Sequence, residues 1–130
     1  MILFFDRSVG TTIPQILQWK QLKFPIQVEY HQARFKSDEQ DDIWLPIVGQ
    51  WGWTVIGHDS SYHINPNELS ALKQYKIGCF YLWGSEANKW EKLRCFVRAY
   101  DRILAADANT PRPFVYRVIQ TGLLRTVTIP

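Results

Sequence analysis

Three aspartates stand where apolar segments give way to polar ones, and together they could hold a divalent metal ion. Asp6 ends the apolar run at residues 2–6, and Asp59 follows the run at 53–58. Asp41 opens a helical pattern between them. Carboxylate oxygens are preferred ligands of Mg²⁺ and Mn²⁺. Metal ions held in this way activate water and stabilise charge at a phosphoryl centre. The trio therefore predicts metal-dependent hydrolysis of a phosphoester.

The phase of the helical pattern separates Asp41 from Asp42. The apolar residues Trp44, Val48 and Trp51 follow at the spacing of one helix face. At about 100° per residue, Asp41 lies within roughly 50° of the centre of this face, and Asp42 lies about 150° away. Asp41 should therefore point inward, where an unpaired carboxylate is costly and a metal ion would remove that cost. Asp42 should face solvent.

Each acid also has a structural explanation when it is taken alone. An aspartate at a strand end can cap a loop, and Asp41 can interact with the helix dipole or pair with Arg7 or Arg34. Arg7 can equally bind phosphate, which makes it a candidate substrate contact together with Ser61 and His63. The three histidines share no zinc spacing, so structural or surface roles are favoured for them. No glycine-rich phosphate loop and no Ser–His–Asp or Cys–His arrangement is suggested by spacing.

Apolar runs and helical patterns alternate along the chain, and this order places the acids. Strands are expected at residues 2–6, 26–30, 53–58 and 77–83, and helices at about 11–22, 38–51, 65–75 and 85–106. The polar stretch at 31–40 is expected to be a loop that leads into the second helix. Two β runs, at 114–119 and 123–129, follow. This order predicts an α/β fold with a parallel sheet and helices on both faces. Functional sites in such sheets lie beyond the carboxyl ends of the strands.

The longest predicted helix has an apolar side and a basic side. The apolar side consists of Trp90, Leu93, Val97, Tyr100 and Leu104. The basic side consists of Lys89, Lys92, Arg94, Arg98 and Arg102. A basic stripe of this kind is most often solvated surface, and contact with nucleic acid is the alternative.

The bulk composition limits the classes of protein to which the chain can belong. Its 130 residues fit one domain, and 46% hydrophobic with 21% charged residues is a globular rather than a disordered composition. No stretch approaches the roughly 20 apolar residues of a membrane span, and no signal peptide is expected. Cys79 and Cys95 are expected to be buried free thiols in a reducing, cytoplasmic compartment. The formal net charge of +3 tolerates a polyanionic partner.

Three short segments resemble, in their order and spacing, the motifs of PIN-like domains. They are FFDRSVG at 4–10, DDIWLP at 41–46 and VIGHD at 55–59, followed by Asn65-Pro66 and Glu68. The segments are most similar to the PIN-like subgroup related to VapC toxins of prokaryotic toxin–antitoxin pairs. The resemblance spans nearly the whole chain.

This resemblance implies one PIN-like domain over residues 1–130 with a three-layer α/β/α sandwich. It implies a Mg²⁺- or Mn²⁺-dependent endoribonuclease, the toxin of a toxin–antitoxin pair, that cleaves RNA phosphodiester bonds. Asp6, Asp41 and Asp59 match the family's acidic positions and become the expected metal ligands and catalytic residues. A cognate antitoxin protein is an expected partner, and a homodimer is a further expectation.

The sequence departs from the family pattern near the third acid. Gly57 stands where the family often has Thr or Ser, and a fourth carboxylate has no clear counterpart. These departures keep two alternatives open. One is a catalytically degenerate PIN-like module for protein interaction, which would bind no metal. The other is a metal-dependent phosphatase of small phosphoesters, which strand-end acids would also suit.

Overall fold

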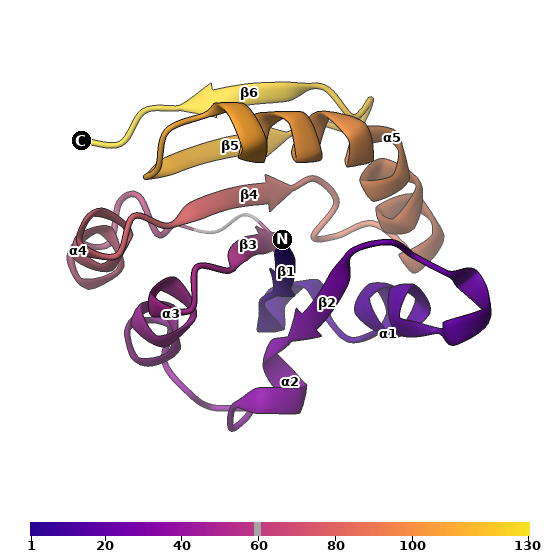
Figure 1. Cartoon of the computed structure of the whole chain (residues 1–130), viewed down its shortest axis with the longest axis horizontal. Helices are drawn as coiled ribbons and strands as arrows, with labels where there is room; N and C mark the ends of the chain where they lie inside the picture. Colours follow the sequence, from indigo (N-terminus) through magenta and orange to yellow (C-terminus); the bar gives the residue numbers. More distant parts are fainter. Residues whose placement is uncertain (59–60) are drawn as a thin grey trace.

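The structure, a computed structural model, describes residues 1–58 and 61–130 and is built around one β-sheet (Figure 1). Within these residues the sheet has six strands in the order β2-β1-β3-β4-β5-β6. They are β1 (Ile2–Phe5), β2 (Gln27–Tyr30), β3 (Thr54–His58), β4 (Gly78–Leu82), β5 (Phe114–Val118) and β6 (Leu124–Val127). Neighbouring strands from β2 to β5 run parallel, and β6 pairs antiparallel with β5. The predicted central, mainly parallel sheet with a C-terminal β pair is confirmed.

Helices cover both faces of the sheet and complete the three layers of an α/β/α sandwich. They are η1 (Arg7–Val9), α1 (Thr12–Gln18), η2 (Lys20–Leu22), α2 (His31–Arg34), α3 (Asp41–Gln50), α4 (Pro66–Gln74) and α5 (Lys89–Asn109). Helices α1 and α5 pack against one face, and α3 and α4 pack against the other (Figure 1). This confirms the fold class predicted from the order of the elements.

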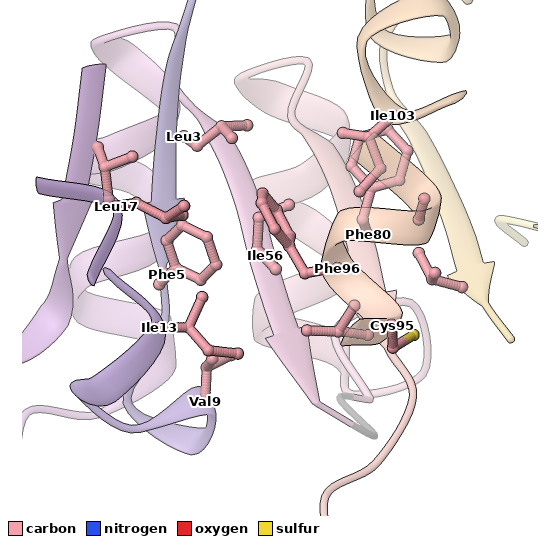
Figure 2. Close-up of a cluster of buried hydrophobic side chains, with 14 of the residues drawn as sticks. Leu3, Phe5, Val9, Ile13, Leu17, Ile56, Phe80, Cys95, Phe96 and Ile103 are labelled. Carbon is pink, nitrogen blue, oxygen red and sulfur yellow. The ribbon is translucent and has the colours of Figure 1, made fainter. Parts of the chain in front are cut away.

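The first strand shows how one apolar run serves both layers. Leu3 and Phe5 pack with the side chains of α1 and α5, whereas Phe4 packs with those of α3 and α4. Side chains alternate across a strand, so a strand between two helix layers needs apolar residues at successive positions. Figure 2 shows the α1 and α5 side of this core, where the rings of Phe5 and Phe96 have centroids 5.7 Å apart.

A short helix, α2, follows β2 directly, and the prediction of a loop throughout 31–40 was wrong. Its first residue, His31, is fully buried. The His31 ring packs against Phe35 and Trp44, with ring centroids 5.6 and 5.8 Å away. Burial of this ring holds the chain close to the sheet after β2, where a polar loop would run over the surface.

Helix α5 buries a face that only partly overlaps the predicted one, since Leu93 and Tyr100 of the predicted face pack against the core as partly buried residues. Its buried residues are Cys95, Phe96, Ala99 and Ile103. At about 100° per residue, the centre of the predicted apolar face lies about 125° away from the centre of this buried face. Trp90 and Val97 are consequently 62% and 61% exposed. Among the described residues, no helix, α5 included, is long and apolar enough to cross a membrane.

The two cysteines are buried free thiols, as the sequence predicted. Burial raises the pKa of both Cys79 and Cys95. Both side chains are therefore protonated at neutral pH and serve as small core residues.

Candidate active site

Asp6 lies at the carboxyl end of β1 and is only 3% exposed. Its backbone N–H donates to the carbonyl oxygen of Ile56 at 2.8 Å, which fixes it beside the neighbouring strand β3. Carboxylate atom Oδ1 accepts hydrogen bonds from the Ser8 backbone N–H, at 2.8 Å, and from the Ser8 hydroxyl. Atom Oδ2 accepts a hydrogen bond from the Tyr62 hydroxyl. The carboxylate is thus held in one orientation by donors on both of its oxygens.

Burial raises the pKa of Asp6 above its ordinary value. The hydrogen bonds from Ser8 and Tyr62 oppose this shift, and the nearby carboxylate of Asp41 adds to it. A buried carboxylate that faces a second carboxylate is stabilised by a cation placed between them. The electrostatics of Asp6 therefore favour a bound positive charge.

Asp41 occupies the first turn of α3 and is half-buried. Its Oδ1 accepts a hydrogen bond from the Trp44 indole N–H at 3.1 Å. Asp42 has a different environment, since its Oδ2 accepts a hydrogen bond from the Asn67 side-chain amide at 3.2 Å. The structure places Asp41 on the inward side of α3, although Trp51, predicted on the same face, is 48% exposed at the helix C-terminus.

Asp6 and Asp41 line one cavity of about 290 Å³ at the carboxyl edge of the sheet. Its lining in the described residues consists of Asp6, Arg7, Ser8, Asp41, His58, Ser61, Tyr62 and Asn65. His58 is the last residue of β3, and its Nδ1 lies 2.6 Å from the Leu82 carbonyl oxygen of β4. The His58 backbone N–H donates to the Ser8 hydroxyl at 3.0 Å. Strand ends β1, β3 and β4 are thereby linked around the cavity.

Of the three predicted substrate contacts, two lie in the cavity lining and one lies outside it. Arg7 and Ser61 line the cavity. His63 lies beside Tyr81, with its Nδ1 2.8 Å from the Tyr81 hydroxyl oxygen, and is not part of the lining. The Arg7 guanidinium donates to the carbonyl oxygen of Ser37. Asp59, the third predicted acid, lies outside the described residues.

The sequence left open that Asp41 pairs with Arg7 or Arg34 instead of binding a metal ion. Arg34, one of its two predicted partners, instead forms an ion pair with Glu29 at 2.9 Å. Within residues 1–58 and 61–130, Arg7 and Asp41 form no ion pair either. The inward carboxylate is therefore held by the indole of Trp44 and by no arginine in the part of the chain that the structure describes.

Tyr62 is the residue of this site that the sequence did not single out. Its side chain is 2% exposed, and its hydroxyl reaches Asp6 from 56 positions further along the chain. No spacing rule connects two residues so far apart. Ser8 could have been found, because an aspartate that accepts a hydrogen bond from the N–H two residues later is a common turn. Both residues orient the same carboxylate.

Two carboxylates with oriented oxygens form an oxygen-rich pair that fits Mg²⁺ or Mn²⁺. In residues 1–58 and 61–130, no three His, Cys, Asp or Glu side chains gather closely enough to hold a metal ion. Asp6 and Asp41 therefore supply the carboxylate oxygens that the described residues bring to this cavity.

The PIN-like domain family matches residues 1–84, and the chain belongs to that family. The matched segment contains Asp6 and Asp41 and the strands that carry the cavity, whereas α5, β5 and β6 follow it. PIN-like domains are generally nucleases and typically use divalent metal ions. No curated protein and no solved structure matches the chain.

Proposed function

We propose that this protein is a metal-dependent endoribonuclease that cleaves RNA phosphodiester bonds. The observation that carries the proposal is the cavity at the carboxyl edge of the sheet, where buried Asp6 and half-buried Asp41 meet. Membership of the PIN-like domain family supports it, since the fold is of the nuclease type.

In this proposal Asp6, Asp41 and Asp59 hold Mg²⁺ or Mn²⁺. The metal would supply an activated water and stabilise the charge that develops on the phosphoryl group. The hydrogen bonds from Tyr62 and Ser8 fix the direction of the Asp6 carboxylate and favour its ionised form. These two are positioning residues, because they act on the reaction through Asp6.

The substrate side of the cavity is formed by Arg7 and Ser61, which we propose as contacts to the RNA phosphate. An arginine can bind two phosphate oxygens at once, and a serine hydroxyl can donate to a third. His63 stays a predicted substrate contact that lies beside Tyr81 rather than in the lining.

We further propose that the whole of residues 1–130 forms one PIN-like domain that acts as a cytoplasmic toxin of the VapC-related subgroup. The order of the motifs at 4–10, 41–46 and 55–59 supports this subgroup. We also propose that a cognate antitoxin blocks the cavity and that the protein forms a homodimer.

The test is RNA cleavage in the presence of Mn²⁺ by wild type and by three variants. Asp6→Asn and Asp41→Asn should each lose cleavage by at least about 100-fold, because each removes a charged metal ligand. Asp42→Asn is the matched control, and it should cleave like wild type because Asp42 is outside the cavity lining. Equal cleavage by wild type and Asp6→Asn would point to a contaminating nuclease and would overturn the proposal.

Two additional measurements separate the alternatives. Faster turnover of a small phosphoester than of RNA would identify a phosphatase instead. Calorimetric titration with Mn²⁺ that gives no heat with wild type would identify a protein-interaction module without metal.

A further inference from the structure

A second cavity, of about 310 Å³, adjoins the candidate active site. It shares the lining residues Arg7 and Ser8 with the cavity that contains Asp6 and Asp41, so the two cavities are neighbours. The second cavity is walled by η1, by the start of α1 and by the first turn of α5. Its outer part lies beyond residues 1–84, the segment that matches the PIN-like family.

The second cavity is lined by basic side chains, whereas the first contains two carboxylates. Arg7, Lys89 and Lys92 line the second cavity, and no carboxylate does among the residues that the structure describes. In the same described part of the chain, none of these three cations forms an ion pair. The cavity thus combines three basic side chains with no acidic partner to compensate them.

Hydroxyl groups accompany the basic side chains. Thr11 and Thr12 line the second cavity, whereas the Ser8 hydroxyl, which also lines it, already donates to Asp6. Hydroxyl and basic side chains together are the usual contacts of proteins to phosphate oxygens. The described lining contains no aromatic residue, so it offers no platform on which a base could stack.

We propose that the second cavity binds the phosphodiester backbone next to the phosphate that occupies the active site. This inference rests on the proposed function, because it places the scissile phosphate beside Asp6 and Asp41. Contacts of this kind carry no base specificity, so sequence preference must arise elsewhere.

The test measures binding without cleavage. Labelled single-stranded RNA is titrated by fluorescence anisotropy in EDTA, over a range of salt concentrations. The variant Lys89→Gln/Lys92→Gln removes two charges from the cavity, and Lys20→Gln/Lys73→Gln removes two charges from exposed positions elsewhere. The loss of two phosphate contacts should weaken binding about tenfold at low salt and make the slope of log K against log salt shallower by about 1.4. The control pair should keep the wild-type slope.

A parallel titration with single-stranded DNA of the same sequence tests the contact itself. An equal decrease in slope for RNA and DNA is expected, because the backbone phosphates are common to both. An unchanged slope in Lys89→Gln/Lys92→Gln, or an equal decrease in the control pair, would overturn the proposal. If circular dichroism shows that the double variant does not fold, Lys89→Gln alone is used, since Lys89 is exposed at the start of α5.

The two proposals can fail separately. If wild type does not cleave RNA with Mn²⁺ but the lysine variant still lowers the salt slope, the proposed function fails and the backbone contact stands. If wild type cleaves and the slope does not change, the backbone contact alone is wrong.

Discussion

The two ends of strand β3 hold two carboxylates in opposite surroundings. At the amino end, the Asp107 carboxylate accepts hydrogen bonds from the Thr54 hydroxyl and from the Arg112 guanidinium, both at 2.8 Å. At the carboxyl end, Asp6 accepts hydrogen bonds from the neutral hydroxyls of Ser8 and Tyr62. The charged neighbour of Asp6 is the carboxylate of Asp41, which raises the pKa of Asp6 further, whereas the charged neighbour of Asp107 is the guanidinium of Arg112.

The difference separates a carboxylate that stabilises the fold from one that suits chemistry. The charge of Asp107 is compensated by Arg112, so nothing is gained there by binding a further cation. Asp6 is buried, and the two hydroxyls that orient it among the described residues, those of Ser8 and Tyr62, are uncharged. Burial of acidic groups in this way is typical of functional sites.

The largest expected effect is on the activity of Asp6→Asn. We expect cleavage to fall by at least about 100-fold while the free energy of unfolding stays equal or rises. The variant removes a buried charge, and the Tyr62 hydroxyl can turn to accept a hydrogen bond from the new amide. Cleavage and urea unfolding are measured on the same preparation. A variant that loses both activity and stability would contradict the contrast between the two ends of β3.

Asp107→Asn should have the opposite profile. Removing the charge breaks the ion pair with Arg112, which is mostly buried, and should lower the free energy of unfolding by about 2 kcal/mol. Cleavage per folded molecule should stay at the wild-type value. Urea unfolding followed by tryptophan fluorescence checks the stability, and loss of activity in fully folded protein would show that this end of β3 also contributes to the site.

Tyr62→Phe tests whether the hydroxyl positions Asp6. The hydrogen bond from Tyr62 lowers the pKa of Asp6, so its removal should raise that pKa. We expect cleavage to fall by about tenfold and the acidic limb of the pH–rate profile to move to higher pH. Tyr81→Phe is a control, because the Tyr81 hydroxyl is hydrogen-bonded to His63 rather than to Asp6. A lower rate with an unmoved acidic limb would indicate a structural role only.

The smallest expected effect is the pH dependence of stability. Burial raises the pKa of Asp6 above its ordinary 3.8, so the folded state binds this proton more tightly than the unfolded state does. Its contribution to stability is complete at low pH and is lost as the pH rises through the raised pKa. Metal-free wild type should therefore lose stability relative to Asp6→Asn between acidic and neutral pH. Mn²⁺ should restore the loss in wild type only, and a difference that is constant with pH would contradict this account.

The sequence predicted the sheet because its central strands are apolar on both faces. The run at 2–6 could not have been a surface strand, and the position of Asp6 followed from its end. Helical phase likewise picked out Asp41, which lines the cavity, although Asp42, predicted to face solvent, is half-buried as well and accepts a hydrogen bond from Asn67. Local patterns were sufficient for the first strand and for the start of α3.

The same reasoning failed for α5 because two candidate apolar faces compete on that helix. Large side chains such as Trp90 marked one face, whereas the face that packs contains the small residues Cys95 and Ala99. Small residues let a helix approach the sheet, and hydrophobicity alone does not report this. The bond from Tyr62 to Asp6 was equally beyond reach, since only the folded chain brings the two together.

The position of α5 late in the chain has a consequence for synthesis. One face of the strands that lead to Asp6 and His58 is covered in part by Phe96 of this helix (Figure 2). Until α5 has left the ribosome, that apolar face is exposed to water, and the sheet cannot close over it. Asp6 and Asp41 are therefore synthesised well before α5 can pack against the sheet.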